Sequence, residues 1–147
     1  MATIREVKDL VANFEQSQEK IMNDCINDTS ELILEKNRDQ LMLGKDKKGN
    51  EILPEYTPFT IEIKKEKGQP TDRVTLKDTG EWHKSLFMKI EGKNIFIDSD
   101  HELTDELMEK YDRGGETILG IPQMKKEIIN ESIMDKFIKI FRLMTKL

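Results

Sequence analysis

The chain has 147 residues, with 24 lysine and arginine against 29 aspartate and glutamate side chains and a formal net charge of −5. This length suits one domain with its own core, and the negative charge disfavours a dedicated nucleic-acid or membrane binder. Cys25 is the single cysteine, which excludes an internal disulfide. No apolar run approaches the roughly 18 residues of a membrane span, and no signal-peptide core follows Met1. We therefore expect a protein made in a reducing cytoplasm that has no membrane partner.

The first predicted element is a helix over residues 3–43. Its apolar side chains follow the three-and-four spacing of one helical stripe: Ile4, Val7, Val11, Phe14, Ile21 and Cys25. The polar cluster at residues 27–30 would kink this helix, or end it and cap a second one through Thr29 or Ser30. Gly44 would stop it. Because a continuous helix of this length would span roughly 60 Å, it would project from a small domain or require partners.

Residues 44–121 predict a small α+β core. A polar loop with a turn near residues 49–50 leads to Thr57 and Pro58, which suit an N-cap and the first position of a short helix ending before Gly68. The alternation of Ile61 to Ile63 would equally suit a strand, although we favour the helix. The lysine runs 45–48 and 64–67 are expected to be solvated surface.

A helical turn is expected at residues 81–85. Two apolar runs, 86–90 and 95–98, are separated by a glycine-containing turn and predict the clearest β-hairpin of the chain. A short helix follows over residues 103–111 and would end at Gly114-Gly115. Residues 118–121 would form a brief strand or an extended segment.

Pro122 opens the last predicted helix, which runs nearly to Leu147. Its apolar side chains cover an arc of roughly 220°, whereas a helix lying on one core needs a stripe of about 100°. These side chains are Ile129, Met134, Phe137, Ile138, Ile140, Phe141, Leu143 and Met144. Either this helix is sandwiched inside the fold or a second subunit covers part of it, and in a chain of this size we favour the second.

The predicted fold is therefore α+β: a long N-terminal helix, a small antiparallel hairpin with short helices, and a long C-terminal helix. We expect one domain over residues 1–147, made of a helical segment 1–43, an α+β core 44–121 and a C-terminal helix 122–147. The expected interface with copies or partners comprises Val7, Val11, Phe14, Phe137, Ile138, Phe141 and Met144.

Residues suited to catalysis or metal binding are sparse. His83 and His101 do not have the spacing of a zinc site, and no glycine-rich phosphate loop or nucleophile elbow is present. The segment 98–102 could hold a divalent cation, but Asp and Ser at such places more often cap helices. We expect no enzymatic activity, no cofactor and no metal. Lys136, Lys139 and Arg142 complement the dipole of the last helix, and contact with DNA passing a channel is the alternative.

Residues 56–85 resemble the neck and tail-completion proteins of tailed phages. Those proteins carry Leu, two residues, Thr-Gly, a few residues and Ser ahead of a β-hairpin, and Leu76, Thr79, Gly80 and Ser85 match this pattern. Lys64-Lys65, the Gly-Gln-Pro at 68–70 and Asp78 are similar to versions from phages of Bacteroides-type hosts, including crAss-like phages. The resemblance covers roughly residues 40–121, and it departs from the family at Trp82-His83, where another aromatic residue is common.

In this pattern Gly80 permits positive φ, Thr79 or Asp78 can cap the next turn, and Leu76 and Trp82 can anchor both sides in the core. These are structural roles. The resemblance implies a virion protein at the head–tail junction, assembled in the host cytoplasm as a ring of about twelve copies. Its partners would be further copies, the portal, tail or other neck proteins and, without sequence specificity, packaged DNA.

Two other readings remain open at this point. A small adaptor or regulatory protein could bind a host or phage partner through its helical ends. A metal-dependent hydrolase would use Asp98, Asp100, His101 and Glu102. We favour the assembly role, because a ring offers partners both to the long first helix and to the apolar last helix.

Overall fold

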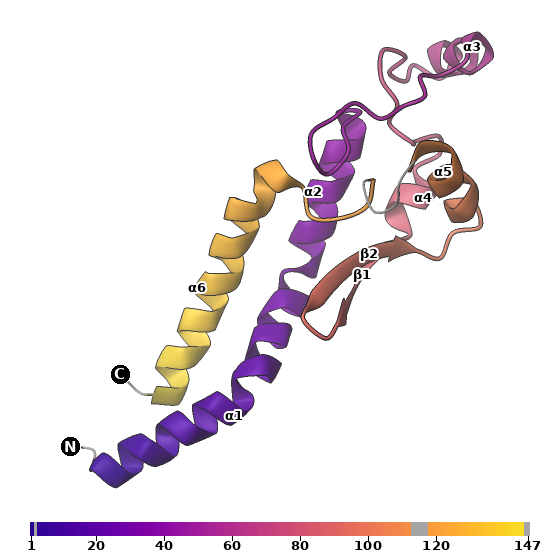
Figure 1. Ribbon diagram of the computed structural model, residues 1–147. Coiled ribbons are helices and arrows are strands. Elements are labelled where there is room, and N and C mark those ends of the chain that lie inside the picture. Colours follow the sequence, from indigo (N-terminus) through magenta and orange to yellow (C-terminus); the bar gives the residue numbers. More distant parts are fainter. Residues whose placement is uncertain (2, 113–117, 146–147) are drawn as a thin grey trace. The chain divides into compact units, whose positions relative to one another are not determined.

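The computed structural model describes residues 1, 3–112 and 118–145 (Figure 1). The fold is α+β, as predicted, with two long terminal helices, short helices and a two-stranded hairpin. The chain forms two compact units, residues 1–31 with 127–147, and residues 32–126. The expected helix end at Gly114-Gly115 lies outside the described residues, and the single-domain prediction stays a prediction.

The first unit begins with helix α1, Ile4–Asp28. Its N-terminus has a capping box, in which the Thr3 hydroxyl accepts from the Glu6 N–H at 3.2 Å and the Glu6 carboxylate accepts from the Thr3 N–H at 2.6 Å. The predicted break after α1 is present, since helix α2 covers Ser30–Met42. The prediction that Thr29 or Ser30 is an N-cap is wrong. Thr29 has a helical backbone and its hydroxyl donates back to the Cys25 carbonyl at 2.8 Å, while Ser30 is already helical.

The last helix, α6, covers Lys126–Thr145 after a 3₁₀ turn at Gln123–Lys125, and it packs against α1 in the antiparallel sense (Figure 1). Phe14 of α1 contacts two rings of α6 edge to face, with centroids 5.7 Å from Phe137 and 4.9 Å from Phe141. The buried residues of this helix pair share one stripe on each helix: Ile21, Cys25, Ile129 and Ile133.

The second unit starts with the C-terminal part of α2, which ends just before Gly44, as predicted. Gly44 has φ +69°, and Lys45 and Glu51 pair across a tight turn as an isolated bridge. Helix α3, Pro58–Glu66, has Thr57 as its N-cap, with the Thr57 hydroxyl accepting from the Thr60 N–H at 3.3 Å. The helix at this place, rather than a strand, is therefore confirmed.

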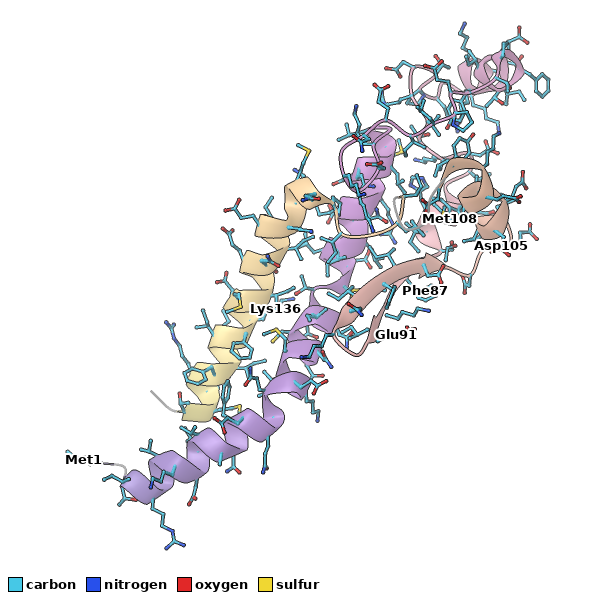
Figure 2. All side chains as sticks on the ribbon, in the orientation of Figure 1. Met1, Phe87, Glu91, Asp105, Met108 and Lys136 are labelled. Carbon is cyan, nitrogen blue, oxygen red and sulfur yellow. The ribbon has the colours of Figure 1, made fainter. Side chains whose placement is uncertain are left out.

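The hairpin is also confirmed. Strand β1, Leu86–Glu91, pairs with strand β2, Asn94–Ser99, in the antiparallel register that sets Leu86 opposite Ser99. Phe87 and Glu91, both in β1, are labelled in Figure 2. Helix α4, Glu81–Lys84, precedes the hairpin and helix α5, Thr104–Tyr111, follows it.

Residues 118–120 form a bend and not the strand that was one of the two expected forms. Ile118 is almost fully buried, and its carbonyl accepts hydrogen bonds from the side-chain amides of Asn37 at 3.4 Å and Gln40 at 3.1 Å. These two amides attach Ile118 to α2.

Replacing Gly44 by alanine should destabilise the protein more than replacing Gly68. Both glycines have positive φ, so each substitution carries a backbone cost of about 1–2 kcal/mol. A methyl group on Gly44 would also lie 2.6 Å from the Arg73 Cβ, whereas one on Gly68 would meet nothing within 4 Å. Urea unfolding of the two variants measures the difference, and equal losses would contradict the close packing of Gly44 on Arg73.

Candidate functional site

The predicted motif residues gather in the second unit, where the chain passes from α3 to the hairpin. The Tyr56 hydroxyl accepts from the N–H groups of Thr75 at 2.9 Å and Leu76 at 3.3 Å. Leu76 has φ +53°, a left-handed conformation that costs energy for a residue with a Cβ. Its side chain is buried, as predicted. The two hydrogen bonds to Tyr56 thus hold a strained turn in place.

Lys64 of α3 stabilises the same turn from the other side. Its ammonium donates to the Lys77 carbonyl at 2.8 Å and to the Gln69 side-chain oxygen at 3.1 Å, and lies 4.7 Å from the centre of the Tyr56 ring. Only 6% of Lys64 is exposed. The prediction that this lysine is solvated surface is therefore wrong, because tertiary partners replace its water.

The next part of the motif forms a tight turn into α4. Asp78 forms an ion pair with Lys67, and its carbonyl accepts from the Gln69 side chain at 2.7 Å. The Thr79 hydroxyl accepts from the Glu81 N–H at 3.3 Å, and Gly80 has φ +90°. Gly80 therefore has the positive φ that the sequence suggested, and it is itself the N-cap residue of α4, while the Thr79 hydroxyl bonds to the first N–H of that helix.

Trp82 and Ser85 tie α4 to the hairpin and to α5. The Trp82 indole donates to the Thr104 hydroxyl at 3.1 Å, and that hydroxyl donates to Ser99 at 2.9 Å. Ser99 contacts the Ser85 hydroxyl at 2.6 Å, which in turn donates to the Trp82 carbonyl at 2.7 Å. This closed set of hydrogen bonds fixes how three elements meet, and it occupies the hydroxyls that a nucleophile would need free.

His83 is buried directly behind the motif. Its Nε2 lies 2.9 Å from the Thr75 carbonyl, and its own carbonyl accepts from Arg38 at 2.8 Å. Burial lowers the pKa of His83, so the neutral ring donates from Nε2 to Thr75. This histidine therefore helps to hold the turn through Thr75.

A groove of about 320 Å³ borders the motif. Its apolar wall consists of Tyr56, Leu76, Trp82, Leu103, Leu107 and Tyr111. Its polar lining comes largely from side chains that already hold the turn, Lys64 and Asp78 among them. The arrangement shapes a surface beside the motif.

The acidic segment 98–102 runs from the last residues of β2 into the turn before α5. A carboxylate oxygen of Asp98 accepts from the Ser99 N–H at 2.8 Å, and the His101 Nδ1 accepts from the Leu103 N–H at 3.2 Å. Among the described residues, no group of three or more His, Cys, Asp and Glu side chains is placed to hold a metal ion. Within the same residues, no helix is long and apolar enough to cross a membrane.

The predicted interface residues all lie on α1 and α6. Phe14 and Phe137 are half-buried against each other. The other five are each between a third and a half exposed: Val7, Val11, Ile138, Phe141 and Met144. Burial raises the pKa of the nearby Cys25 thiol, which stays protonated inside the helix pair.

The three basic side chains proposed for DNA contact differ in their surroundings. Lys136 points from α6 toward α1 and its ammonium donates to the Asp28 carbonyl at 2.7 Å (Figure 2). Lys139 and Arg142 are exposed. The Lys136 ammonium therefore already has a hydrogen-bond partner within the chain, and the DNA contact stays a prediction.

Sequence reasoning missed Tyr56 and Lys64 as parts of this site. Tyr56 precedes the α3 cap and has no periodic signal, and Lys64 stands in a run of charged residues that resembles any solvated helix face. Both act on residues that follow them in the chain, Lys64 on Lys77 and Tyr56 on Thr75. Local patterns cannot reveal contacts of this kind.

Replacing Tyr56 by phenylalanine should lower the free energy of unfolding by about 1–3 kcal/mol, because it leaves the N–H groups of Thr75 and Leu76 without their acceptor. Tyr111→Phe is the matched control, since the Tyr111 hydroxyl has no hydrogen-bond partner among the described residues. Denaturant unfolding with equal losses for both variants would contradict the role of Tyr56.

The stability of the protein should fall with acidification through the titration of His83. Because burial lowers its native pKa, the unfolded chain takes up the proton first, so stability is full above about pH 6.5 and drops by up to ~1.4 kcal/mol per pH unit below it. Unfolding measured between pH 7.5 and 5 should show a shallower dependence in His83→Gln. An unchanged slope in that variant would refute the assignment.

Comparison with models of protein families, with curated proteins and with solved structures finds no match to this chain. No family is therefore assigned by similarity. The resemblance to phage neck proteins rests on the motif residues alone, and it enters below as support for a proposal.

Proposed function

We propose that this chain is a structural virion protein, a head–tail connector or tail-completion subunit that forms part of a neck ring between portal and tail. The observation that carries the proposal is the exposed apolar surface of α1 and α6. An assembly subunit requires such a surface, and an independent globular chain does not.

The exposed residues of α1 and α6 exceed what the helix pair can bury. The 25 residues of α1 include two buried side chains and the 20 residues of α6 include two. Large apolar side chains exposed by more than a third on these helices are Ile4, Val7, Val11, Ile128, Met134, Ile138, Phe141, Leu143 and Met144. Each such side chain contributes roughly 1.5–3 kcal/mol when fully buried, so a contact that covers several of them can drive stable association.

The motif supports the choice of assembly. Leu76, Thr79, Gly80 and Ser85 stand between a long helix and a β-hairpin, in the order that the resemblance to neck proteins implies. Their contacts build a rigid turn rather than a reactive centre. Neck subunits act through geometry, and a rigid connection between helices and hairpin suits that role.

A DNA passage fits the exposed basic side chains of α6. Lys139 and Arg142 are free to contact phosphates, and such contacts are independent of sequence. With a chain of net charge −5, this contact would be local and weak, as a channel through which DNA must slide requires.

Replacing one exposed apolar residue by a charge should abolish assembly without unfolding the chain. Val11→Glu and Ile138→Glu each place a carboxylate on surface that is 47% and 39% exposed in the single chain. We expect the thermal midpoint to move little and the amount of protein recovered with portal-containing particles on a density gradient to fall at least tenfold.

The matched control for these variants is Asn130→Glu, which adds the same charge at an exposed polar position of α6. It should assemble like the wild type. Wild-type protein that never sediments with portal-containing particles, or apolar-to-charge variants that assemble normally, would contradict the proposal. Binding to an unrelated host protein through α1 and α6 would instead favour an adaptor.

A further inference from the structure

The segment 70–79, which lies between α3 and α4, makes no backbone–backbone hydrogen bond with any described residue. Its shape therefore depends on side chains. The Tyr56 hydroxyl accepts from two N–H groups of the segment, and the Lys64 ammonium donates to the Lys77 carbonyl. Helices and strands are held by repeated backbone bonds that break together, whereas a segment held in this way can open without disturbing its neighbours.

Backbone strain lowers the free energy that opening of this segment requires. Leu76 has φ +53°, which is unfavourable for a residue with a Cβ, and an open segment can return to an ordinary backbone conformation. The side chains of Val74 and Leu76 oppose opening, because they are buried and would be exposed to water. We therefore expect a closed segment at neutral pH, with a small open population.

His83 of α4 is a buried titratable group packed against the segment, with its Nε2 2.9 Å from the Thr75 carbonyl. Among the described residues, the charged groups that act on its ring are Lys77 of the segment and Arg38 of α2, and both are cations. Burial lowers the pKa of His83, the carbonyls of Thr75 and Leu76 oppose this shift, and the two cations add to it. A proton on the ring is therefore unfavourable while the segment is closed.

We propose that protonation of His83 releases the segment 70–79 as a unit, while the helices and the hairpin stay folded. The open segment hydrates the charged ring and relieves the strain at Leu76. It also takes Leu76 out of the wall of the groove that Trp82 lines, so acid changes the shape of that surface. The release occurs within a single chain and does not depend on assembly.

Hydrogen exchange of backbone amides, followed by NMR on the full chain between pH 7.5 and 5, tests this release. The protection factors of the Thr75 and Leu76 amides should fall by up to about thirtyfold over this range, because a histidine with the ordinary pKa of about 6.5 takes up the proton in the open form. In folded His83→Gln, which cannot titrate in this range, the same protection factors should no longer depend on pH.

Urea separates local release from global unfolding. Exchange of the Thr75 and Leu76 amides should respond little to low concentrations of urea, because opening of a short segment exposes little surface. Amides bonded within the β1–β2 ladder should exchange more slowly and accelerate steeply with urea, since they require unfolding of the chain. This measurement is made on the wild type and needs no variant.

Two neighbouring lysines of α3 provide a matched pair of variants. Lys64→Met removes the donor to the Lys77 carbonyl and should lower the protection of the Thr75 and Leu76 amides at least about fivefold at every pH. Lys65→Met removes a charge at an exposed position of the same helix and should leave that protection unchanged. Circular dichroism verifies that each variant is folded.

Two results overturn the inference. In the first, the Thr75 and Leu76 amides exchange as slowly as those of the β1–β2 ladder and with the same urea dependence, so that the segment opens only when the whole chain unfolds. In the second, the pH dependence of their protection persists unchanged in folded His83→Gln, so that another group controls the opening.

Discussion

Two helices packed side by side can bury only one stripe of each other. In this protein α1 and α6 use that stripe for Ile21, Cys25, Ile129 and Ile133, and Phe14 extends it toward Phe137 and Phe141. Many of the remaining large apolar side chains of both helices are more than a third exposed. This constraint links the amino-acid sequence to the proposed role. The apolar surface that the helix pair leaves exposed is unfavourable in water for a single chain, whereas its burial against neighbours would contribute affinity in an assembly.

The motif between α3 and the hairpin forms a turn whose shape is fixed by hydrogen bonds. Leu76 adopts a strained backbone conformation, which Tyr56 holds by accepting two N–H groups and Lys64 supports through the Lys77 carbonyl. Strain of this kind persists only where surrounding contacts over-determine it. The contacts serve rigidity, and their hydroxyl, amide and ammonium groups are used within the fold.

The elements that local chemistry governs were predictable from the sequence. The helix after Thr57 and Pro58, the stop at Gly44 and the hairpin around Gly92 all follow from caps, turn residues and periodicity. Features that depend on distant contacts were not predictable. Lys64 has the sequence surroundings of a surface lysine, but its ammonium donates to the Lys77 carbonyl. The Ile118 carbonyl accepts from two side-chain amides of α2, a contact between residues about 80 positions apart. The Thr29 hydroxyl donates to the Cys25 carbonyl of α1, although the sequence suited it equally well to be the N-cap of α2.

The central claim is that exposed apolar surface on α1 and α6 makes this chain one subunit of a larger ring. Light scattering coupled to size-exclusion chromatography, on the wild-type chain alone and with the portal protein of the same genome, tests it most directly. The account predicts one homogeneous species with a molar mass many times that of a single chain, at least when the portal is present. A monomer or dimer under both conditions would contradict it.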